Sequence, residues 1–238
     1  MKIKIINVKL FFLLSFISIN MIFSQEVYIA GGGTLYDWAN LNRFKEENKE
    51  LIKNPNTDRV VFLGNSITEG WSNFDPDFFT KNPFVNRGIS GQTTPQMLIR
   101  FKPDVVNLIP KAVVILAGIN DIAENTGHIS IENIAENIIS MSEIAKSNKI
   151  DVYICSTLPA IDFPWSPGLN PAPKVIQLNS ILKKYCEENK ITYVDYYSKM
   201  ADKKGGLKVP DFTSKDDLVH PNLEGYKLME KIILKILK

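Results

Sequence analysis

Short apolar runs alternate along this chain with segments in which apolar residues recur at helical spacing. Each run has the length of a strand and is bounded by polar, Gly or Pro residues. Continuous apolar runs of this length are typical of strands that are covered on both faces, as in parallel sheets. We therefore expect strands at 59–64, 84–86, 112–118, 151–157 and 191–196.

The segments between these runs show the spacing of amphipathic helices. In 131–148, Ile recurs at positions 131, 134, 138 and 144, which places these side chains on one helix face. Thr94-Pro95 is typical of a helix start, with Thr94 as the N-cap and Pro95 at the first helical position. Further helices are expected over 35–53, 175–189 and 223–237. Alternating strands and helices predict one α/β domain, over 25–238, with a parallel sheet between helical layers.

The N-terminal segment has the pattern of an export signal. Three lysines among the first nine residues precede a mostly apolar run over 10–23, and the small Ser24 follows. The run is short for a membrane span, which takes about 20 apolar residues. We therefore predict a secretory signal peptide over 1–24 and a periplasmic or secreted protein with no membrane span after cleavage. An uncleaved N-terminal anchor is the alternative.

The net charge argues against a nucleic-acid partner. The full chain carries 28 Lys and Arg against 26 Asp and Glu, a formal net charge of +2. Removal of 1–24 takes away three lysines and no acid, which leaves a net charge of about −1. A nearly neutral chain without a long basic run has no electrostatic basis for binding nucleic acid.

The chain has two cysteines, Cys155 in a predicted strand and Cys186 in a predicted helix. Their apolar surroundings favour two buried free thiols, while export would also permit a disulfide. Neither cysteine has the spacing of a metal ligand, and we expect no metal site.

Ser66 directly follows the first predicted strand, within the sequence Gly64-Asn65-Ser66-Ile67-Thr68. Ligands of open parallel sheets bind beyond the carboxyl ends of the strands. A serine at this point can present its hydroxyl group at the edge of the sheet. A serine after a strand can equally be an N-cap of the next helix, so the position alone leaves both interpretations open.

The chain has two histidines, and His220 follows a candidate carboxylate partner, Asp217. Asp217 precedes it by three residues, so one turn of backbone brings the carboxylate to a ring nitrogen. Serine catalysis needs an imidazole that takes the hydroxyl proton and a carboxylate that orients the imidazole. The alternative is a solvated histidine in a helix-capping loop. His128 follows Gly127 and is expected to be a surface residue.

Two other strand ends carry groups that could stabilise a negatively charged oxygen. The Gly-rich segment 86–91 could offer the backbone N–H of Gly88, and 117–121 could offer the side-chain amide of Asn120. With the backbone N–H of Ser66 they would form an oxyanion hole. Segments of this composition are also common in ordinary turns.

Taken together, these segments resemble the SGNH (GDSL-type) hydrolase family. The resemblance rests on four blocks that occur in the family's order between residues 60 and 222: Gly64-Asn65-Ser66-Ile67-Thr68, Gly88, Gly118-x-Asn120-Asp121 and Asp217-x-x-His220. It implies a three-layer α/β/α sandwich with a central parallel sheet, of flavodoxin-like type.

The resemblance also implies the roles of the site residues. Ser66 would be the nucleophile, His220 the general base and Asp217 the carboxylate that orients it. Ser66, Gly88 and Asn120 would form the oxyanion hole, and neither a metal nor a cofactor would be used. The family usually has Asp where this chain has Asn65. We expect Asn65 to support the turn by hydrogen bonds, and Asp121 to hold the Asn120 loop rather than act as a second acid.

The segment 86–101 and the Pro-rich loop 159–173 are similar to the platelet-activating-factor acetylhydrolase-like and carbohydrate acetylesterase branch. This similarity implies short acyl groups, acetyl foremost, and export favours an O-acetylated glycan as the substrate. Phe163 and Trp165 could bind that substrate, or could only pack the loop onto the domain. Two alternatives stay open: a lysophospholipase or thioesterase for longer acyl chains, and a catalytically weak glycan-binding relative.

Overall fold

The computed structural model describes residues 30–237, so the predicted signal peptide over 1–24 lies outside the described residues. Five parallel strands form one sheet in the order β2-β1-β3-β4-β5. The strands are β1 (Val60–Gly64), β2 (Phe84–Gly88), β3 (Ala112–Leu116), β4 (Asp151–Cys155) and β5 (Thr192–Val194). All five predicted strands are confirmed, because strands that are buried on both faces consist mostly of apolar residues.

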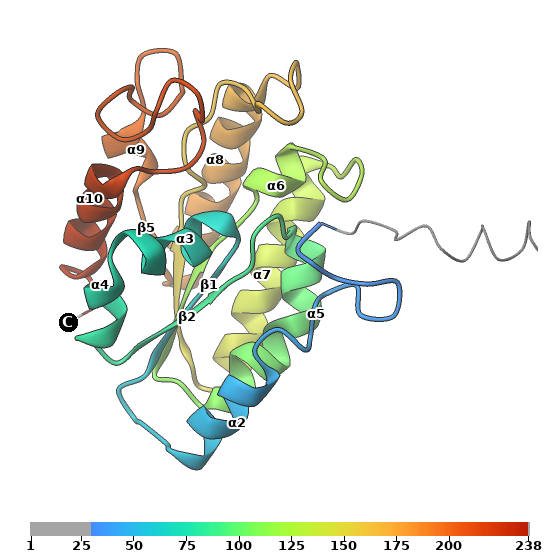
Figure 1. The fold of residues 1–238 in the computed structure, drawn as a ribbon, viewed down its shortest axis with the longest axis vertical. Helices are drawn as coiled ribbons and strands as arrows, with labels where there is room; N and C mark the ends of the chain where they lie inside the picture. Colours follow the sequence, from blue (N-terminus) through green and yellow to red (C-terminus); the bar gives the residue numbers. More distant parts are fainter. Residues whose placement is uncertain (1–29, 238) are drawn as a thin grey trace, which may run out of the picture.

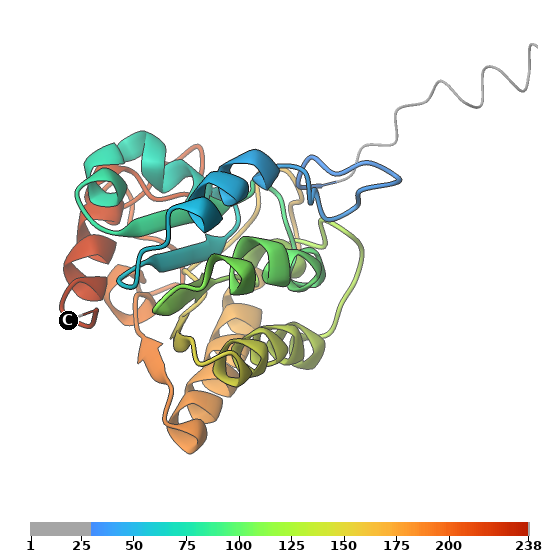
Figure 2. The ribbon, with the colours of Figure 1, turned by 90° about the horizontal axis from the view of Figure 1, so that it is seen from below.

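Helices cover both faces of the sheet and make the fold a three-layer α/β/α sandwich, as predicted (Figures 1 and 2). One face carries α3 (Ser66–Phe74), α4 (Pro76–Thr80) and α10 (Leu223–Ile233). The other face carries α5 (Thr94–Asp104), α7 (Ile131–Ser147) and α8 (Pro171–Asn189), and α2 (Lys45–Lys53) packs beside α5. The short elements η1 (Val106–Leu108), α6 (Ile119–Ile122) and α9 (Tyr197–Met200) complete the described chain.

The predicted helix over 35–53 is wrong in its first half. Only α2 is helical there, and the preceding residues form turns. The Asp37 carboxylate accepts hydrogen bonds from the backbone N–H groups of Leu41 and Asn42, and Asn40 has a positive φ of 54°. Side chain-to-backbone hydrogen bonds of this kind compete with the helix. The apolar side chains of Leu35 and Tyr36 are consequently exposed.

The start of α5 lies one residue from its predicted place. Thr93, not Thr94, is the N-cap, in a capping box with Gln96. Thr94 instead donates its backbone N–H and its hydroxyl group to Asp121 (2.9 and 2.6 Å). The N-terminus of α5 is thereby attached to the loop that follows β3.

Cys155 and Cys186 are both buried free thiols, as the sequence favoured. Burial raises the pKa of both thiols, so they are inert under ordinary conditions. None of the helices within residues 30–237 combines the length and the apolar character needed to cross a membrane.

Candidate active site

Ser66 is the first residue of α3, two residues after the end of β1. Asn65 is the N-cap of this helix, and its side-chain oxygen accepts the backbone N–H of Ile67 at 3.0 Å. Asn65 thus supports the turn by a hydrogen bond, as expected. The N–H groups of a first helical turn have no partner within the helix, so the Ser66 N–H can serve a ligand.

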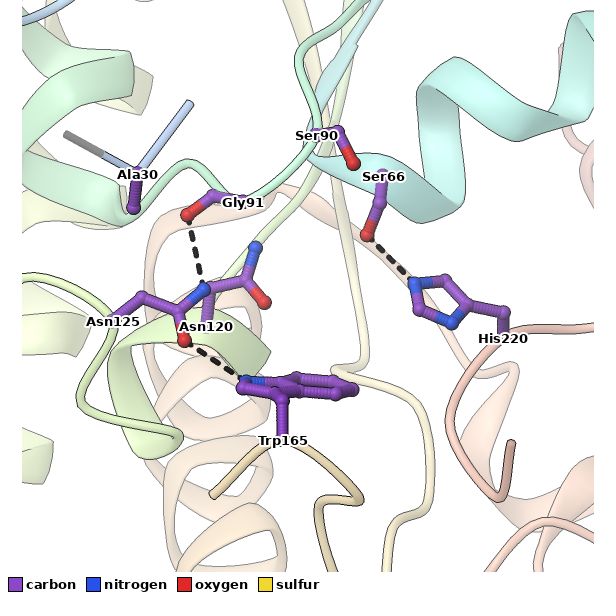
Figure 3. Close-up of a pocket in the computed structure, with 8 residues that line it drawn as sticks. All are labelled: Ala30, Ser66, Ser90, Gly91, Asn120, Asn125, Trp165 and His220. Carbon is purple, nitrogen blue, oxygen red and sulfur yellow. Dashed lines mark hydrogen bonds between the residues drawn. The ribbon is translucent and has the colours of Figure 1, made fainter. Parts of the chain in front are cut away.

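His220 and Asp217 lie on the loop between α9 and α10. His220 meets Ser66 beyond the carboxyl end of β1 (Figure 3). The Ser66 hydroxyl oxygen is 2.9 Å from His220 Nε2. His220 Nδ1 is 2.9 Å from Asp217 Oδ1 and 3.1 Å from Oδ2. An ionised Asp217 accepts the Nδ1–H, and this tautomer leaves the Nε2 lone pair for the Ser66 proton.

A cavity of about 390 Å³ opens in front of the Ser66 hydroxyl group. The side-chain amide of Asn120 lies in its wall and donates one N–H to the Gln92 carbonyl at 3.1 Å. The second N–H of the same amide is left for a ligand. The lining residues are Ala30, Ser66, Ser90, Gly91, Asn120, Asn125, Trp165 and His220 (Figure 3).

Gly88 does not occupy the donor position that the sequence predicted for it. Its backbone N–H donates to the Asn86 side-chain oxygen at 2.8 Å, and it does not line this cavity. A Cβ atom on Gly88 would lie 2.1 Å from the backbone nitrogen of Glu69, so glycine is required here for packing against α3.

Gly91, three residues later, lines the cavity beside Asn120. Its φ of +79° favours glycine, and its N–H has no acceptor among the residues that the structure describes. The structure thus places Gly91, and not Gly88, beside Asn120 in the wall of the first cavity, while Gly88 lines the adjoining hollow. The Gly-rich segment signalled a donor, but its composition did not distinguish between the two glycines.

Asp121 acts on the site only through its neighbours. It is buried, and desolvation raises the pKa of its carboxyl group to about 6, against the lowering effect of the hydrogen bonds from Thr94. These bonds attach the Asn120 loop to α5, in agreement with the structural role expected for Asp121. His128 pairs with Glu124 on an exposed loop at 3.0 Å, as predicted for a surface residue.

The two aromatic residues of the Pro-rich loop have different positions. Trp165 lines the cavity with 46% of its surface exposed, and its ring centroid lies 6.2 Å from that of His220. Phe163 is fully buried behind Trp165, at 5.3 Å between ring centroids, so it supports the loop and lines no part of the cavity. Asn125, which no sequence pattern indicated, accepts the Trp165 indole N–H at 3.1 Å.

A second, more polar hollow of about 590 Å³ shares Ser66 and Ser90 with the first cavity. Arg43, Glu47 and Glu69 contribute charged groups to its wall. Glu69 accepts the Ser90 N–H at 2.8 Å and pairs with Arg43 at 3.5 Å. The Ser66 hydroxyl group thus stands where two hollows meet.

Comparison with known proteins identifies the family of the chain. The model of the GDSL-like lipase/acylhydrolase family matches residues 62–228, and the chain belongs to this family, whose members hydrolyse ester bonds. A solved structure from Bacteroides fragilis, named as an acylhydrolase, is 50% identical with a TM-score of 0.80, covering 84% of this chain and 97% of its own. The family predicted from the sequence is therefore confirmed.

Two further matches are more distant. The acetylxylan esterase of Geobacillus stearothermophilus shares the fold at 19% identity and a TM-score of 0.62, over 77% of this chain and 95% of its own. The uncharacterized lipoprotein YqeF of Bacillus subtilis is 32% identical over 121 residues, 43% of this chain. This chain spans about half the length of that curated relative, 49%.

Proposed function

We propose that the protein removes short acyl groups, acetyl foremost, from an O-acylated glycan outside the cytoplasm, with Ser66, His220 and Asp217 as its catalytic triad. The observation that carries this proposal is the continuous series of contacts from Asp217 through His220 to the Ser66 hydroxyl oxygen, each 2.9 Å long. Serine hydrolases need such a series because a serine hydroxyl group is a weak nucleophile without an adjacent base.

The reaction follows from these positions. His220 Nε2 takes the hydroxyl proton as Ser66 Oγ attacks the ester carbonyl carbon. The backbone N–H groups of Ser66 and Gly91 and the Asn120 amide stabilise the negatively charged oxygen. His220 then transfers its proton to the leaving alcohol as the C–O bond breaks. Water, deprotonated by His220, hydrolyses the acyl-enzyme and restores the Ser66 hydroxyl group.

The side chains around Ser66 favour a short acyl group. Among residues 30–237, the large apolar side chains that line the two hollows are those of Trp165 and Phe44. A long acyl chain gains its affinity from buried apolar surface, about 0.8 kcal/mol for each methylene group. These hollows offer little such surface, which speaks against the lysophospholipase and thioesterase alternatives.

The alcohol part of the ester lies toward Trp165 in this proposal. The leaving oxygen must approach His220 Nε2 to receive its proton, and the Trp165 ring is the aromatic surface beside His220. The apolar face of a sugar ring can bury against an exposed indole, while the sugar hydroxyl groups reach Asn125 and solvent. A glycan ester fits this combination.

Export of the protein is part of the proposal. The pattern over 1–24 supports it, and the matched Bacillus relative is named a lipoprotein. Expression of the full chain, followed by N-terminal sequencing of the periplasmic and medium fractions, tests it. A mature chain that begins near residue 25 is expected, and an intact N-terminus in the membrane fraction would indicate the anchor instead.

The catalytic claim is tested by covalent labelling and hydrolysis. A fluorophosphonate probe should label the wild type and leave Ser66→Ala unlabelled, and Ser66→Ala should lose hydrolysis of p-nitrophenyl acetate. Ser90→Ala is the matched control, because Ser90 lines the same cavity and makes no contact with His220 that would activate it. Labelling that persists in Ser66→Ala would refute the triad.

The substrate claim is tested by acetate release from acetylated oligosaccharides and by p-nitrophenyl esters of increasing chain length. Preference for chains of eight or more carbons, on the order of tenfold, would favour the lipid alternatives. Trp165→Ala should raise KM for an acetylated oligosaccharide about tenfold and leave KM for p-nitrophenyl acetate nearly unchanged. Tyr36→Ala removes an exposed aromatic side chain that lines neither hollow, and serves as the control.

A further inference from the structure

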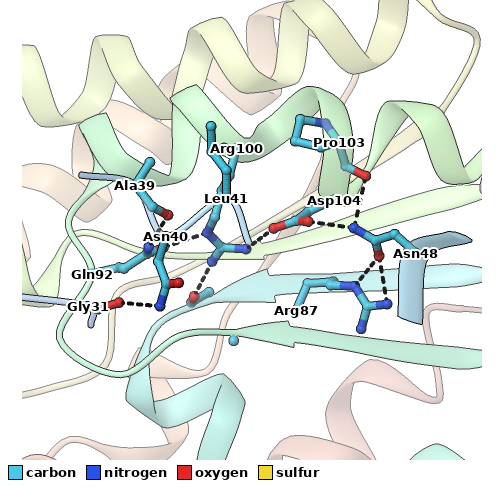
Figure 4. Close-up of polar contacts among 12 residues, drawn as sticks. Gly31, Ala39, Asn40, Leu41, Asn48, Arg87, Gln92, Arg100, Pro103 and Asp104 are labelled. Carbon is cyan, nitrogen blue, oxygen red and sulfur yellow. Dashed lines mark hydrogen bonds and ion pairs between the residues drawn. The ribbon is translucent and has the colours of Figure 1, made fainter. Parts of the chain in front are cut away.

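A buried guanidinium group lies directly beneath the proposed active site. Arg100, on α5, is fully buried and has three different acceptors (Figure 4). Its Nη2 donates to the Gly64 carbonyl at 2.9 Å, its Nη1 to Asp104 Oδ2 at 3.1 Å, and its Nε to the side-chain oxygen of Gln92.

Two of these acceptors belong to the loops that form the site. Gly64 ends β1 and precedes Ser66 by two residues, and Gln92 directly follows Gly91. The Gln92 carbonyl also accepts the Asn120 amide at 3.1 Å. The acceptors of Arg100 are therefore adjacent to all three groups of the proposed oxyanion hole. Gly64 lies two residues from Ser66, and Gln92 is next to Gly91 and accepts the Asn120 amide.

The supporting contacts hold this arrangement from both sides. Gln92 Nε2 donates to the Ala39 carbonyl at 2.8 Å, which fixes the amide that accepts from Arg100. Asp104 Oδ1 accepts from Asn48 Nδ2 at 2.7 Å, so the carboxylate is oriented as well. Burial lowers the pKa of Arg100 to about 10, with Asp104 opposing the shift, so the group remains charged at neutral pH.

Stability alone does not account for such a group. Replacing a buried ion pair by apolar residues of similar volume is often neutral or stabilising, because both charges lose their hydration. A planar guanidinium group does provide donors in a fixed fork, which fixes the relative positions of its acceptors. In this protein two of the three acceptors, Gly64 and Gln92, are close in sequence to Ser66 and Gly91.

We propose that Arg100 is a positioning residue that holds the oxyanion-hole donors in register with the Ser66 hydroxyl group. Arg100 touches neither the substrate nor the reacting atoms, and it acts through Gly64 and Gln92. The inference rests on the proposed esterase function, because it assigns a role to the donors of that site.

The chain offers a matched control in Arg59. Its side chain is also buried and also has three acceptors, the carbonyl groups of Leu108 (2.6 Å), Leu51 (2.9 Å) and Asn54 (2.8 Å). It precedes β1, at the end of the sheet opposite Ser66. Loss of its guanidinium group also removes three hydrogen bonds of a buried arginine, here to backbone carbonyl groups far from the site and without a carboxylate partner.

The test measures kcat and KM for p-nitrophenyl acetate, together with Tm, in Arg100→Met, Arg100→Lys and Arg59→Met. Both Met variants should lower Tm. Only the Arg100 variants should lower kcat, by roughly 10²-fold with KM within about threefold, because misplaced donors weaken transition-state binding. Arg100→Lys retains a charge beside Asp104 but lacks the fork, and it decides the question if Arg100→Met does not fold.

A double-mutant cycle that combines an Arg100 variant with Asn120→Ala adds a measurement that a purely structural role of Arg100 would not affect. If Arg100 acts through the oxyanion donors, the combined loss in kcat should be clearly smaller than the product of the single losses. The inference would be overturned if the combined loss in kcat equalled the product of the single losses. It would also be overturned if the kcat of Arg100→Lys equalled that of Arg59→Met. Activity that survives Ser66→Ala would instead refute the proposed function, so the two failures are distinguishable.

Discussion

A single oxygen atom, Asp217 Oδ1, lies 2.9 Å from the backbone nitrogen of His220 and 2.9 Å from its ring nitrogen Nδ1. The same atom accepts the backbone N–H of Val219 at 3.1 Å. Asp217 therefore shapes the loop that carries the imidazole and also orients the imidazole itself. Leu218, between them, has a positive φ of 64°, as this tight turn requires.

The Asp217→Asn variant should separate the role of Asp217 in shaping the loop from its role in orienting the His220 imidazole. The amide oxygen can still accept the backbone N–H groups, so Tm should change by only a few degrees. The uncharged amide cannot stabilise the imidazolium that forms when His220 takes the Ser66 proton, and its NH2 group would lie beside Nδ1, so kcat should fall roughly 10²–10⁴-fold. Kinetics and thermal melts of this variant and of Asp216→Asn, the exposed neighbour, check the prediction. Equal activity of both variants would contradict the orienting role.

Gly91→Ala and Gly88→Ala should differ in what they damage. A Cβ atom on Gly91 would lie 3.0 Å from the Gly31 nitrogen, and the positive φ of +79° would cost about 1–2 kcal/mol in any other residue. We expect a folded protein with kcat lowered about tenfold or more, because the Gly91 N–H moves. On Gly88 the Cβ atom would meet the backbone of α3 at 2.1 Å, which predicts a loss of stability of several kcal/mol. If Gly88→Ala is folded with a low kcat while Gly91→Ala is fully active, Gly88 and not Gly91 supplies the backbone N–H of the oxyanion hole.

Asn65 should be replaceable by Asp and not by Ala. The Asp side chain can accept the Ile67 N–H as Asn65 does, and a negative charge is favourable at a helix N-terminus. We expect Asn65→Asp to keep kcat within about threefold. Asn65→Ala loses the cap of α3 and should cost about 1 kcal/mol of unfolding free energy, together with part of kcat. A strong gain in kcat for Asn65→Asp would show that a negative charge there tunes the site.

The strands and the Asp217–His220 pair could be predicted because their signals are local. Buried parallel strands consist of apolar residues whatever their neighbours are, and Asp217 and His220 are close enough in sequence to meet within one turn. The choice between Gly88 and Gly91 is set by one side-chain contact that the composition of the segment does not show. It depends on the Asn86 side chain, whose oxygen accepts the Gly88 N–H.

Other features also depend on side-chain contacts that the pattern along the chain does not show. The residues before α2 have helical spacing, but the hydrogen bonds of Asp37 turn the backbone instead. Phe163 and Trp165 are both aromatic residues of one loop, and only packing decides that one is buried and the other exposed. The acceptors of Arg100 are far apart in sequence, so no pattern along the chain indicates its connection to the site.

Asp121 should give the protein a pH-dependent stability of known sign. Burial raises the pKa of this carboxyl group from 3.8 to about 6, so between these pH values the folded chain binds a proton that the unfolded chain has released. Its contribution to the free energy of unfolding therefore falls as pH rises from about 4 to about 6, by up to about 3 kcal/mol.

Urea unfolding of the wild type and of Asp121→Asn at pH 4, 5, 6 and 7.5 measures this difference directly, because the contributions of the other titratable groups cancel in the comparison. The stability of the wild type relative to Asp121→Asn should decrease over that range and level off above it. Asp58→Asn, at an exposed carboxylate, should show a much smaller change, and an equally large one would refute the assignment to Asp121.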